Sequence, residues 1–327
     1  MFKGILLTQN DGATAAAYTE LAEEQLPPGD VDVAVEWSTL NYKDGLAITG
    51  AGPVVRSWPM VPGIDFAGTV QASRNESFQP GQRVVLTGWG LGETRWGGLA
   101  ERARVEAGWL LPLPESLSTR SAMIFGTAGV TAALCVLALQ KHGLQPGDGE
   151  ILVTGAAGGV GSVAVALLAG LGHTVVASTG RTDEAPYLTG LGASRIVDRA
   201  ALSAPGKPLQ RELWAGVVDS VGSHTLANAC AQTRSNGAVA ACGLAQGADF
   251  PSTVMPFILR GIALYGINSV YQSNSHRSTA WQLLADHVSA ERLALMAHEI
   301  PLSEAIAVAP QVLAGRTRGR TVVAIGA

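Results

Sequence analysis

The pattern of apolar and polar positions along the chain changes at about residue 120. Before that point, short apolar runs rich in β-branched residues alternate with turns that contain proline and glycine, as at residues 27–30 and 79–82. The runs at residues 31–35, 64–70 and 83–86 predict strands, and few stretches have helical spacing. We therefore expect a small, irregular β-rich barrel in the first part of the chain.

From residue 121 onward, predicted helices and strands alternate. Residues 121–140 carry apolar side chains at helical spacing and predict a helix. Six apolar runs then alternate with helix-length segments, and these runs are residues 151–154, 174–178, 195–198, 216–220, 238–242 and 262–267. This alternation indicates a doubly wound parallel sheet, so the fold class is α/β. A helix at about residues 278–288 and a strand at 320–325 follow, and periodicity alone does not show whether this strand returns to the first lobe.

The composition adds limits to this picture. A length of 327 residues exceeds the range, about 250–300 residues, in which one core usually suffices, so we expect two domains. Charged residues make up 15% of the chain, hydrophobic residues 47%, and glycine contributes 40 residues, which excludes a disordered chain and favours many tight turns. The net charge of −4 offers no electrostatic attraction to nucleic acid or to anionic membranes, so neither partner is expected.

The cysteines and the apolar segments bear on the location of the protein. Three widely spaced cysteines in apolar runs are typical of reduced core residues, not of a disulfide framework or a zinc site. The N-terminus becomes polar too early for a signal peptide. Residues 151–180 lack formal charge over a length that can span a bilayer, but they hold a glycine-rich turn between two β-branched runs. We therefore expect a soluble, cytoplasmic protein.

A glycine-rich turn, Gly-Ala-Ala-Gly-Gly-Val-Gly at residues 155–161, is the strongest chemical signal in the chain. It follows an apolar strand and begins an apolar helix, which is the context in which such a turn binds a dinucleotide. Residues without Cβ atoms let backbone N–H groups approach a pyrophosphate, and the helix adds the positive end of its dipole. The alternative is a purely structural turn. The predicted cofactor-binding residues here are Gly155, Ala157, Gly158, Gly159, Val160 and Gly161.

The end of the second strand of this sheet predicts which dinucleotide binds. NAD-binding proteins tend to place Asp or Glu about 20 residues after the glycines, where it holds the ribose 2′-hydroxyl. Here Ser178 and Thr179 can donate to phosphate oxygens, and Arg181 can neutralise them. Arg199, after the third strand, is a weaker candidate for the same phosphate. Asp183 argues against this prediction, and a solvated loop is the alternative; we favour NADPH.

Other segments at expected strand ends supply further candidate residues. In an open α/β sheet, ligands bind beyond the carboxyl ends of the strands. The candidates in these segments are Thr127, Thr131, Val221, Cys242, Gly243, Leu244, Ile267, Asn268 and Ser269. A plain turn is the alternative for each of them.

The distribution of possible metal ligands argues against catalytic zinc. Zinc needs Cys, His or carboxylate groups that converge on one site. The first 120 residues contain no cysteine and no histidine, and the histidines that follow are scattered. We therefore predict no metal site. A serine hydrolase is also unsupported, because the chain has no Gly-x-Ser-x-Gly motif.

Five motifs together resemble those of the zinc-free, quinone-oxidoreductase-like medium-chain dehydrogenases/reductases. They are Asn-Tyr-Lys-Asp at residues 41–44, Pro-Gly-Ile-Asp-Phe-Ala-Gly at 62–68, Trp-Gly-Gly-Leu-Ala-Glu at 96–101, Gly-Thr-Ala-Gly-Val-Thr-Ala at 126–132 and the glycine-rich turn. The first two, with Ser-Thr-Gly-Arg at 178–181, are similar to the YhdH/YhfP-type branch, whose known activity is NADPH-dependent acrylyl-CoA reduction. The resemblance covers essentially the whole chain.

The resemblance implies an architecture and a reaction. Residues 1–121 with 270–327 would form a GroES-like catalytic domain, and residues 122–269 a Rossmann NADPH-binding domain. It also implies a homodimer, commonly formed through the last Rossmann strand, and a CoA thioester substrate whose C=C bond accepts a hydride at the β-carbon without a metal. The alternatives are an NADPH:quinone or enone oxidoreductase and, in another class, an NADPH-binding protein without turnover.

Three residues of the Asn-Tyr-Lys-Asp motif are the candidate catalytic residues. Hydride addition places charge on the thioester oxygen, and fixed hydrogen-bond donors would stabilise that charge. Asn41 would orient the nicotinamide or the substrate carbonyl, Tyr42 or water would protonate the α-carbon, and Asp44 would hold the loop. Alternatively, Asn41 and Asp44 only cap a turn before a short helix.

Exposed arginines are the candidates for binding the phosphates of CoA. They are Arg56, in the loop at residues 53–59, and one of Arg316, Arg318 and Arg320, of which we prefer Arg318. Solvated arginines without a ligand are the alternative for most of them.

Overall fold

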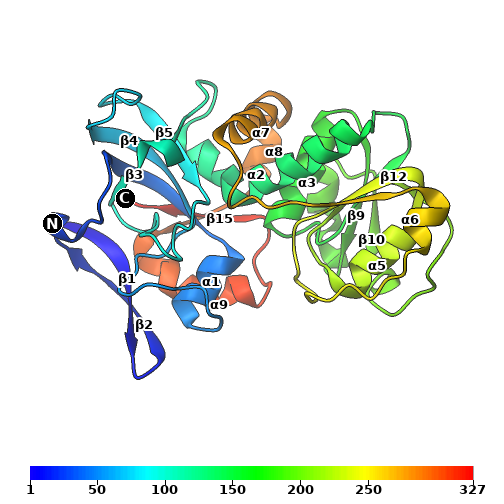
Figure 1. The fold of residues 1–327 in the computed structure, drawn as a ribbon, viewed down its shortest axis with the longest axis horizontal. Coiled ribbons are helices and arrows are strands. Elements are labelled where there is room, and N and C mark those ends of the chain that lie inside the picture. Colours follow the sequence, from blue (N-terminus) through cyan, green and yellow to red (C-terminus); the bar gives the residue numbers. More distant parts are fainter. Residues whose placement is uncertain (327) are drawn as a thin grey trace. The chain divides into compact units, whose positions relative to one another are not determined.

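The computed structural model describes residues 1–326 and divides into two compact units. The first unit holds Met1–Thr127, Val270–Ser278 and the chain from Ala297 onward, and the second holds Ala128–Ser269 and Thr279–Met296. In Figure 1 the strands of the first unit are mainly blue and cyan, and those of the second are green and yellow. The expected α/β class, with a β-rich lobe and a doubly wound sheet, is confirmed.

The first unit is built on a mixed sheet with the strand order β14-β15-β3-β4-β5-β7, in which β6 also pairs with β3. The bounds are β3 (Val31–Leu40), β4 (Asp65–Ser73), β5 (Arg83–Thr87), β6 (Arg102–Val105), β7 (Leu111–Pro112), β14 (Ala297–Pro301) and β15 (Arg320–Ala324). The last strand does return to the first lobe, because Thr321 of β15 lies opposite Leu40 of β3 in an antiparallel pair. Val31, Val33 and Val35 alternate into the core, as a strand with one buried face requires.

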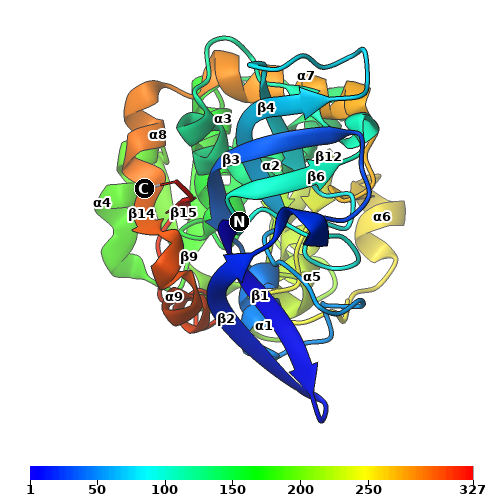
Figure 2. The ribbon, with the colours of Figure 1, turned by 90° about the vertical axis from the view of Figure 1, so that its left-hand side faces the viewer.

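A hairpin and short helices complete the first unit. The hairpin is β1 (Phe2–Asn10) with β2 (Ala13–Leu21), and Figure 2 shows it beside the helix α1 (Tyr42–Thr49). Helix α1 packs against α9 (Ala305–Leu313), and a Cβ on Gly45 would lie 2.9 Å from Leu313, so glycine permits this close approach. The 3-10 turns of this unit are η1 (Glu23–Gln25), η2 (Ala107–Trp109) and η5 (Leu302–Glu304).

The second unit contains a parallel sheet with the strand order β10-β9-β8-β11-β12-β13. The bounds are β8 (Glu150–Val153), β9 (Thr174–Thr179), β10 (Arg195–Asp198), β11 (Trp214–Asp219), β12 (Thr233–Ala241) and β13 (Ala263–Gly266). All six match the strands that the apolar runs predict, within two residues at each end except for β12, which begins five residues earlier than predicted. The order in which successive strands are added reverses between β8 and β11, and open α/β sheets bind ligands at this switch point.

Helices surround this sheet. They are α3 (Gly159–Gly170), α4 (Ala185–Leu191), α5 (Ser223–Gln232), α6 (Met255–Arg260), α7 (Asn274–His287) and α8 (Ala290–Met296), with the 3-10 turns η3 (Thr182–Glu184) and η4 (Arg199–Ala201). Residues 279–296 group with this unit, whereas we expected all of residues 270–327 in the other domain. The reason is packing, since α8 contacts α3 and α4, and Gly170 leaves room for the backbone of His287.

The helix α2 (Thr119–His142) carries the chain from the first unit into the second. It is interrupted at Gly126, whose backbone has a φ of 52° and a ψ of −155°. In residues 1–326, α2 is the one helix long and apolar enough to cross a membrane, and 83% of its most apolar window is buried inside the protein. Burial of this kind is expected for the core helix of a folded domain.

Candidate functional site

The glycine-rich turn joins β8 to α3 and brings backbone atoms unusually close together. Gly155 has a φ of +59°, and a Cβ on Gly161 would lie 2.3 Å from the carbonyl oxygen of Gly155. Only glycine fits at residue 161 without moving α3 away from the turn. Gly158 is the residue before α3, so the first N–H groups of that helix are available at the turn. A cradle of free N–H groups at a helix N-terminus is suited to a diphosphate.

The end of β9 places cationic and hydroxyl groups beside this turn. The Oγ atom of Ser178 is buried and has no hydrogen-bond partner. Thr179 accepts a hydrogen bond from the backbone N–H of Arg181 at 3.0 Å, and the guanidinium of Arg181 donates to the carbonyl of Ala157 at 3.1 Å. A Cβ on Gly180 would lie 2.4 Å from Nε of Arg199, so that second arginine also packs against this strand end. Two cations and an unpartnered hydroxyl suit a phosphate group.

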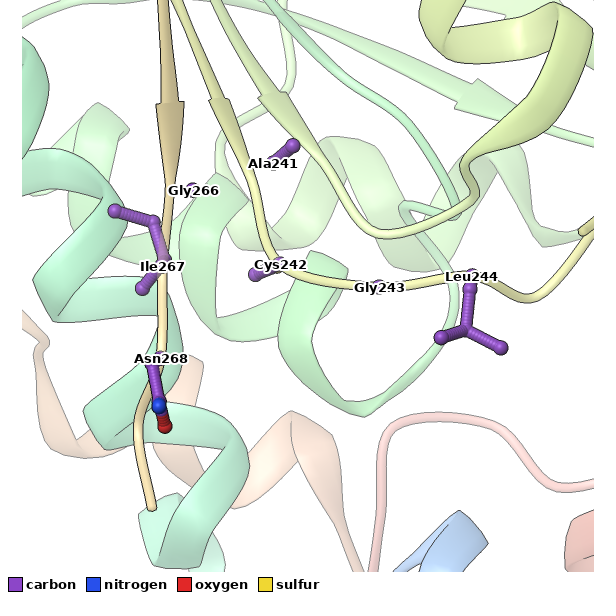
Figure 3. A pocket seen from close by; sticks show the side chains of 7 residues that line it. All are labelled: Ala241, Cys242, Gly243, Leu244, Gly266, Ile267 and Asn268. Carbon is purple, nitrogen blue, oxygen red and sulfur yellow. The ribbon is translucent and has the colours of Figure 1, made fainter. Parts of the chain in front are cut away.

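A cavity of about 450 Å³ opens at the ends of β12 and β13 (Figure 3). Its lining comes from residues 241–244 and 266–268, and Figure 3 shows Ile267 and Asn268 following one strand while Cys242 and Leu244 follow its neighbour. Five of the predicted cofactor-binding residues therefore lie around one cavity, and they are Cys242, Gly243, Leu244, Ile267 and Asn268.

Three other predicted cofactor-binding residues lie elsewhere in the structure. A Cβ on Gly155 would touch the side chain of Val221 at 3.2 Å, so Val221 lies against the glycine-rich turn. Thr131 is buried on α2, where its exposed fraction is 6%. Ser269 is half-buried just after the cavity-lining segment.

Asp219, at the end of β11, is a functional candidate that the sequence reasoning missed. It is fully buried, and its carboxylate accepts hydrogen bonds from the hydroxyl of Thr154 at 2.6 Å and from the backbone N–H groups of Val221 and Gly222 at 3.2 and 2.8 Å. Burial raises the pKa of Asp219, while these hydrogen bonds act in the opposite direction. A carboxylate at the end of an otherwise apolar strand was the available signal, because such a group is rarely buried without partners.

In the first unit, a buried polar cluster surrounds Asn41. Its amide nitrogen donates to Thr39 Oγ1 at 2.8 Å, to Asp44 at 3.1 Å and to Asp65 at 3.2 Å. Its amide oxygen accepts a hydrogen bond from the guanidinium of Arg320 at 3.1 Å. Both ends of the amide therefore have partners within the protein, and these partners fix the orientation of Asn41.

Asp44 anchors the N-terminus of α1 to the loop before β4. One carboxylate oxygen accepts the backbone N–H groups of Gly63 and Ile64, and the other accepts the backbone N–H of Asn41 at 2.8 Å. Burial, followed by the nearby Asp65, raises the pKa of Asp44 from 3.8 to about 7, although the hydrogen bonds oppose this shift. The Asp44 carboxylate caps the start of the helix by accepting the backbone N–H of Asn41, which is one half of the cap in the alternative interpretation of the sequence.

Arg320 and Asp65 hydrogen-bond to the backbone of α2 on either side of Gly126, where the helix is interrupted. Arg320 donates to the carbonyl of Ile124 at 3.0 Å, and Asp65 accepts the backbone N–H of Thr127 at 2.7 Å. A Cβ on Gly126 would lie 2.7 Å from the Arg320 guanidinium and 2.9 Å from the Asp65 carboxylate. Arg320 is 3% exposed, so it is not an exposed phosphate-binding arginine, one of the three possibilities that the sequence left open.

The remaining candidates of the first unit lie at its surface. Tyr42 is 56% exposed at the start of α1, next to Lys43, which forms an ion pair with Glu93 at 2.8 Å. Arg56 and Arg318 are both exposed, and the backbone N–H of Arg56 donates to the carbonyl of Glu93. Within residues 1–326, no group of three or more His, Cys, Asp or Glu side chains is arranged to hold a metal ion.

Comparison with known proteins identifies the family of the chain. Residues 27–115 match the alcohol dehydrogenase GroES-like domain, and residues 159–286 match the zinc-binding dehydrogenase domain. The chain is 52% identical to the probable acrylyl-CoA reductase AcuI of Escherichia coli over 99% of both chains. It is 51% identical to the acrylyl-CoA reductase AcuI of Ruegeria pomeroyi over the full length of both.

A solved structure agrees with this relationship. The YhdH oxidoreductase of Salmonella enterica, crystallised in complex with NADP, is 53% identical and covers 99% of both chains with a TM-score of 0.97. Identity at this level over the whole length indicates membership of the same family, and not only a shared fold. The chain therefore belongs to the quinone-oxidoreductase-like family of medium-chain dehydrogenases/reductases.

Proposed function

We propose that the protein is an NADPH-dependent acrylyl-CoA reductase, which reduces the C=C bond of acrylyl-CoA to give propionyl-CoA. The observation that carries this proposal is the identity of 51–52% over the full length with two proteins named as acrylyl-CoA reductases. Activity resides in particular side chains and not in the fold. The two units must therefore also supply suitable groups for the cofactor and for the substrate.

The groups of the second unit fit NADPH. The glycine-rich turn would hold the diphosphate, and the buried hydroxyl of Ser178, which has no partner, would donate to the 2′-phosphate between Arg181 and Arg199. The cavity beyond β12 and β13 would receive the nicotinamide end. When bound, the reduced nicotinamide supplies the hydride.

The groups of the first unit would serve the acyl thioester. A hydride added at the β-carbon leaves negative charge on the thioester oxygen, which hydrogen-bond donors stabilise. Asn41 is held in one orientation by its internal partners, so it would position the start of α1 and any carbonyl bound there. Asp44 would hold the loop at Gly63 and Ile64, and the exposed hydroxyl of Tyr42 would protonate the α-carbon. Arg56 and Arg318 would meet the phosphates of CoA.

The reaction as proposed needs no metal, because the first 120 residues contain no cysteine or histidine to bind zinc. The test is treatment of the purified enzyme with a strong chelator, followed by metal analysis and an activity assay. We expect full activity and no stoichiometric zinc. Loss of activity that zinc restores would contradict this part of the proposal.

The reaction is tested by isotope labelling together with a comparison of substrates. NADPH deuterated at the nicotinamide C4 position should place deuterium on C3 of propionyl-CoA, and a solvent proton should appear at C2. The competing activity is tested by comparing kcat/KM for acrylyl-CoA with that for a free quinone. A higher value for the quinone would make the protein a quinone oxidoreductase. NADPH binding without oxidation by any activated alkene would make it a binding protein.

The role of Tyr42 has its own test. Tyr42→Phe removes only the hydroxyl of an exposed side chain, so the fold should be unaffected. A positioned proton donor typically contributes about 10²–10⁴-fold, so we expect kcat to fall by at least about 100-fold. Tyr18→Phe, at a tyrosine of the hairpin that is 41% exposed, is the matched control and should leave kcat unchanged. A wild-type rate for Tyr42→Phe would assign the proton to water.

We further propose that the protein is a cytoplasmic homodimer that pairs through the edge strand β13. Helix α6, which precedes that strand in the chain, and the residue before the helix expose apolar side chains, with Val254 66%, Ile258 71% and Leu259 61% exposed. Exposed apolar groups next to an open strand edge favour association with a second copy. Light scattering should give twice the mass of the chain, and Ile258→Asp should give the single mass.

A further inference from the structure

One buried residue, Asp219, contacts three turns at the carboxyl ends of the strands of the second unit. Its carboxylate binds Thr154, the residue before the glycine-rich turn, and the N–H groups of Val221 and Gly222. Its backbone carbonyl accepts the N–H of Cys242 at 2.8 Å and also the Cys242 thiol at 3.3 Å. Asp219 therefore touches the segments that follow β8, β11 and β12.

Ser220, the next residue, reinforces these connections. Its N–H donates to Thr154 Oγ1 at 3.1 Å, and its hydroxyl donates to the Thr154 carbonyl at 3.0 Å. A Cβ on Gly155 would lie 2.5 Å from Ser220 Oγ, and a Cβ on Gly243 would lie 2.3 Å from the Ser220 carbonyl. The glycines at both turns thus let the backbone pack directly against residues 219 and 220.

Asp219 is fully buried, so it does not itself face a ligand. A buried carboxylate is stable only when several donors satisfy it, and the donors here are attached to segments that carry the predicted cofactor-binding residues. Loss of the carboxylate would free the segments that follow β8 and β11, whereas the backbone carbonyl of residue 219 would still hold Cys242. We propose that Asp219 is the positioning residue that holds the glycine-rich turn, residues 221–222 and residues 242–244 in one arrangement that binds NADPH. This inference rests on the proposed function for the identity of its ligand.

The first variant to test is Asp219→Ala, which removes every side-chain link. A hydrogen bond to a charged group is typically worth enough to change an affinity by about 10- to 100-fold, and we expect the Kd for NADPH to rise by that factor. The KM for acrylyl-CoA should stay within about threefold of the wild-type value, because no residue assigned to the substrate contacts Asp219. Asp219→Asn should restore most of the affinity, since an amide keeps an acceptor for the N–H groups and a donor for Thr154.

The control must lose stability without touching the three turns. Thr233→Val serves, because the Thr233 hydroxyl is equally buried, donates to the carbonyl of Ala229 at 2.8 Å, and lies at the first residue of β12, far along the strand from Cys242. We expect this variant to lower Tm while the Kd for NADPH is unchanged. An equal loss of NADPH affinity in Asp219→Ala and Thr233→Val would overturn the proposal, as would a wild-type Kd in Asp219→Ala.

A second measurement keeps the test independent of the cofactor. Amide hydrogen exchange of the protein without NADPH should be faster than wild type at the glycine-rich turn and at residues 221–222 of Asp219→Ala, and unchanged there in Thr233→Val. If Asp219→Ala does not fold, Thr154→Val removes the hydroxyl that donates to Asp219 and accepts the Ser220 N–H, and it should speed exchange at the glycine-rich turn. Unchanged exchange would overturn the positioning role. A wild-type protein that binds no NADPH would instead refute the proposed function, whatever the exchange shows.

Discussion

Replacement of Arg320 by methionine tests whether the cluster around Asn41 depends on a cation. Arg320 is almost completely buried and donates to the carbonyl of Ile124 at 3.0 Å, to Asn41 Oδ1 at 3.1 Å and to Thr39 Oγ1 at 3.2 Å. Methionine has a similar length but no donor. Arg320→Met therefore leaves three acceptors without this partner, and it removes a positive charge from beside the Asp44–Asp65 pair.

The magnitude follows from this geometry. Breaking a buried charged network by removing one member typically destabilises a protein by about 3–5 kcal/mol, because the remaining charges stay buried. Desolvation of the guanidinium is avoided in the variant, which places the expectation at the lower end, about 3 kcal/mol. Total stabilities are about 5–15 kcal/mol, so the variant should still fold. Denaturant unfolding of both proteins measures the difference.

The pH dependence gives the sharper test. Asp44 has a pKa of about 7 in the folded protein against an ordinary 3.8, so the folded state binds this proton more tightly than the unfolded chain does. This carboxyl therefore destabilises the fold when ionised, and its unfavourable effect declines progressively as the pH falls from about 7 to about 3.8. Arg320 binds the Asn41 amide, whose hydrogen bond to Asp44 lowers the pKa of that carboxyl, so without Arg320 we expect the ionised form to be disfavoured further. We expect the loss of stability to be larger at about pH 8 than at about pH 6.

Two outcomes would refute this reasoning. A loss that is the same at both pH values would mean that Arg320 acts through packing and not through charge. A loss below about 1 kcal/mol would mean that the cluster does not need the cation, because that is the range of exposed ion pairs. Arg120→Met is the control, since Arg120 forms an exposed pair with Glu299 and should change stability by less than about 1 kcal/mol.

Three further predictions concern the second unit. Arg181→Ala should weaken NADPH binding by about 10- to 100-fold and NADH binding very little, as calorimetry with both cofactors would show; equal losses would place the 2′-phosphate elsewhere. Gly161→Ala should abolish NADPH binding, because its Cβ would lie 2.3 Å from the Gly155 carbonyl oxygen. Circular dichroism should show that the variant is still folded, and a wild-type Kd for NADPH would contradict the close approach. Cys242 should be the thiol that reacts fastest in the native protein, and NADPH should slow its reaction, since Cys135 and Cys230 are buried. A hydrogen bond with Cys242, followed by burial, raises the pKa of Cys135, and burial raises the pKa of Cys230; equal rates for all three thiols would contradict the structure.

Much of the second unit could be predicted from the sequence because its signals are local. Each strand is a short apolar run, and the glycine-rich turn lies between a strand and a helix that are adjacent in the chain. Close backbone approach at Gly161 is a requirement that only glycine meets, so the residue itself reports the geometry. The small polar residues and the arginine at the end of β9 are also neighbours in the sequence, so their proximity could be predicted.

The contacts within the polar cluster of the first unit could not be predicted from local sequence patterns. Arg320 and Asn41 are separated by 279 positions, and their contact exists because β15 pairs with β3. From the sequence alone, Arg320 is expected to be a solvated side chain, and only the pairing of β15 with β3 shows that it is buried. Asp219 was missed for the same reason, since its partners come from three different strand ends.

The sequence by itself determined the six strands of the second unit, the glycine-rich turn and the family of the chain, because periodicity, glycine positions and motifs depend on neighbouring residues. Only the tertiary structure decided how Asn41, Asp44, Asp65 and Arg320 are partnered and which carboxylates are buried. Burial and hydrogen-bond geometry are set by residues that meet through the sheet, and no local pattern records which distant groups will meet.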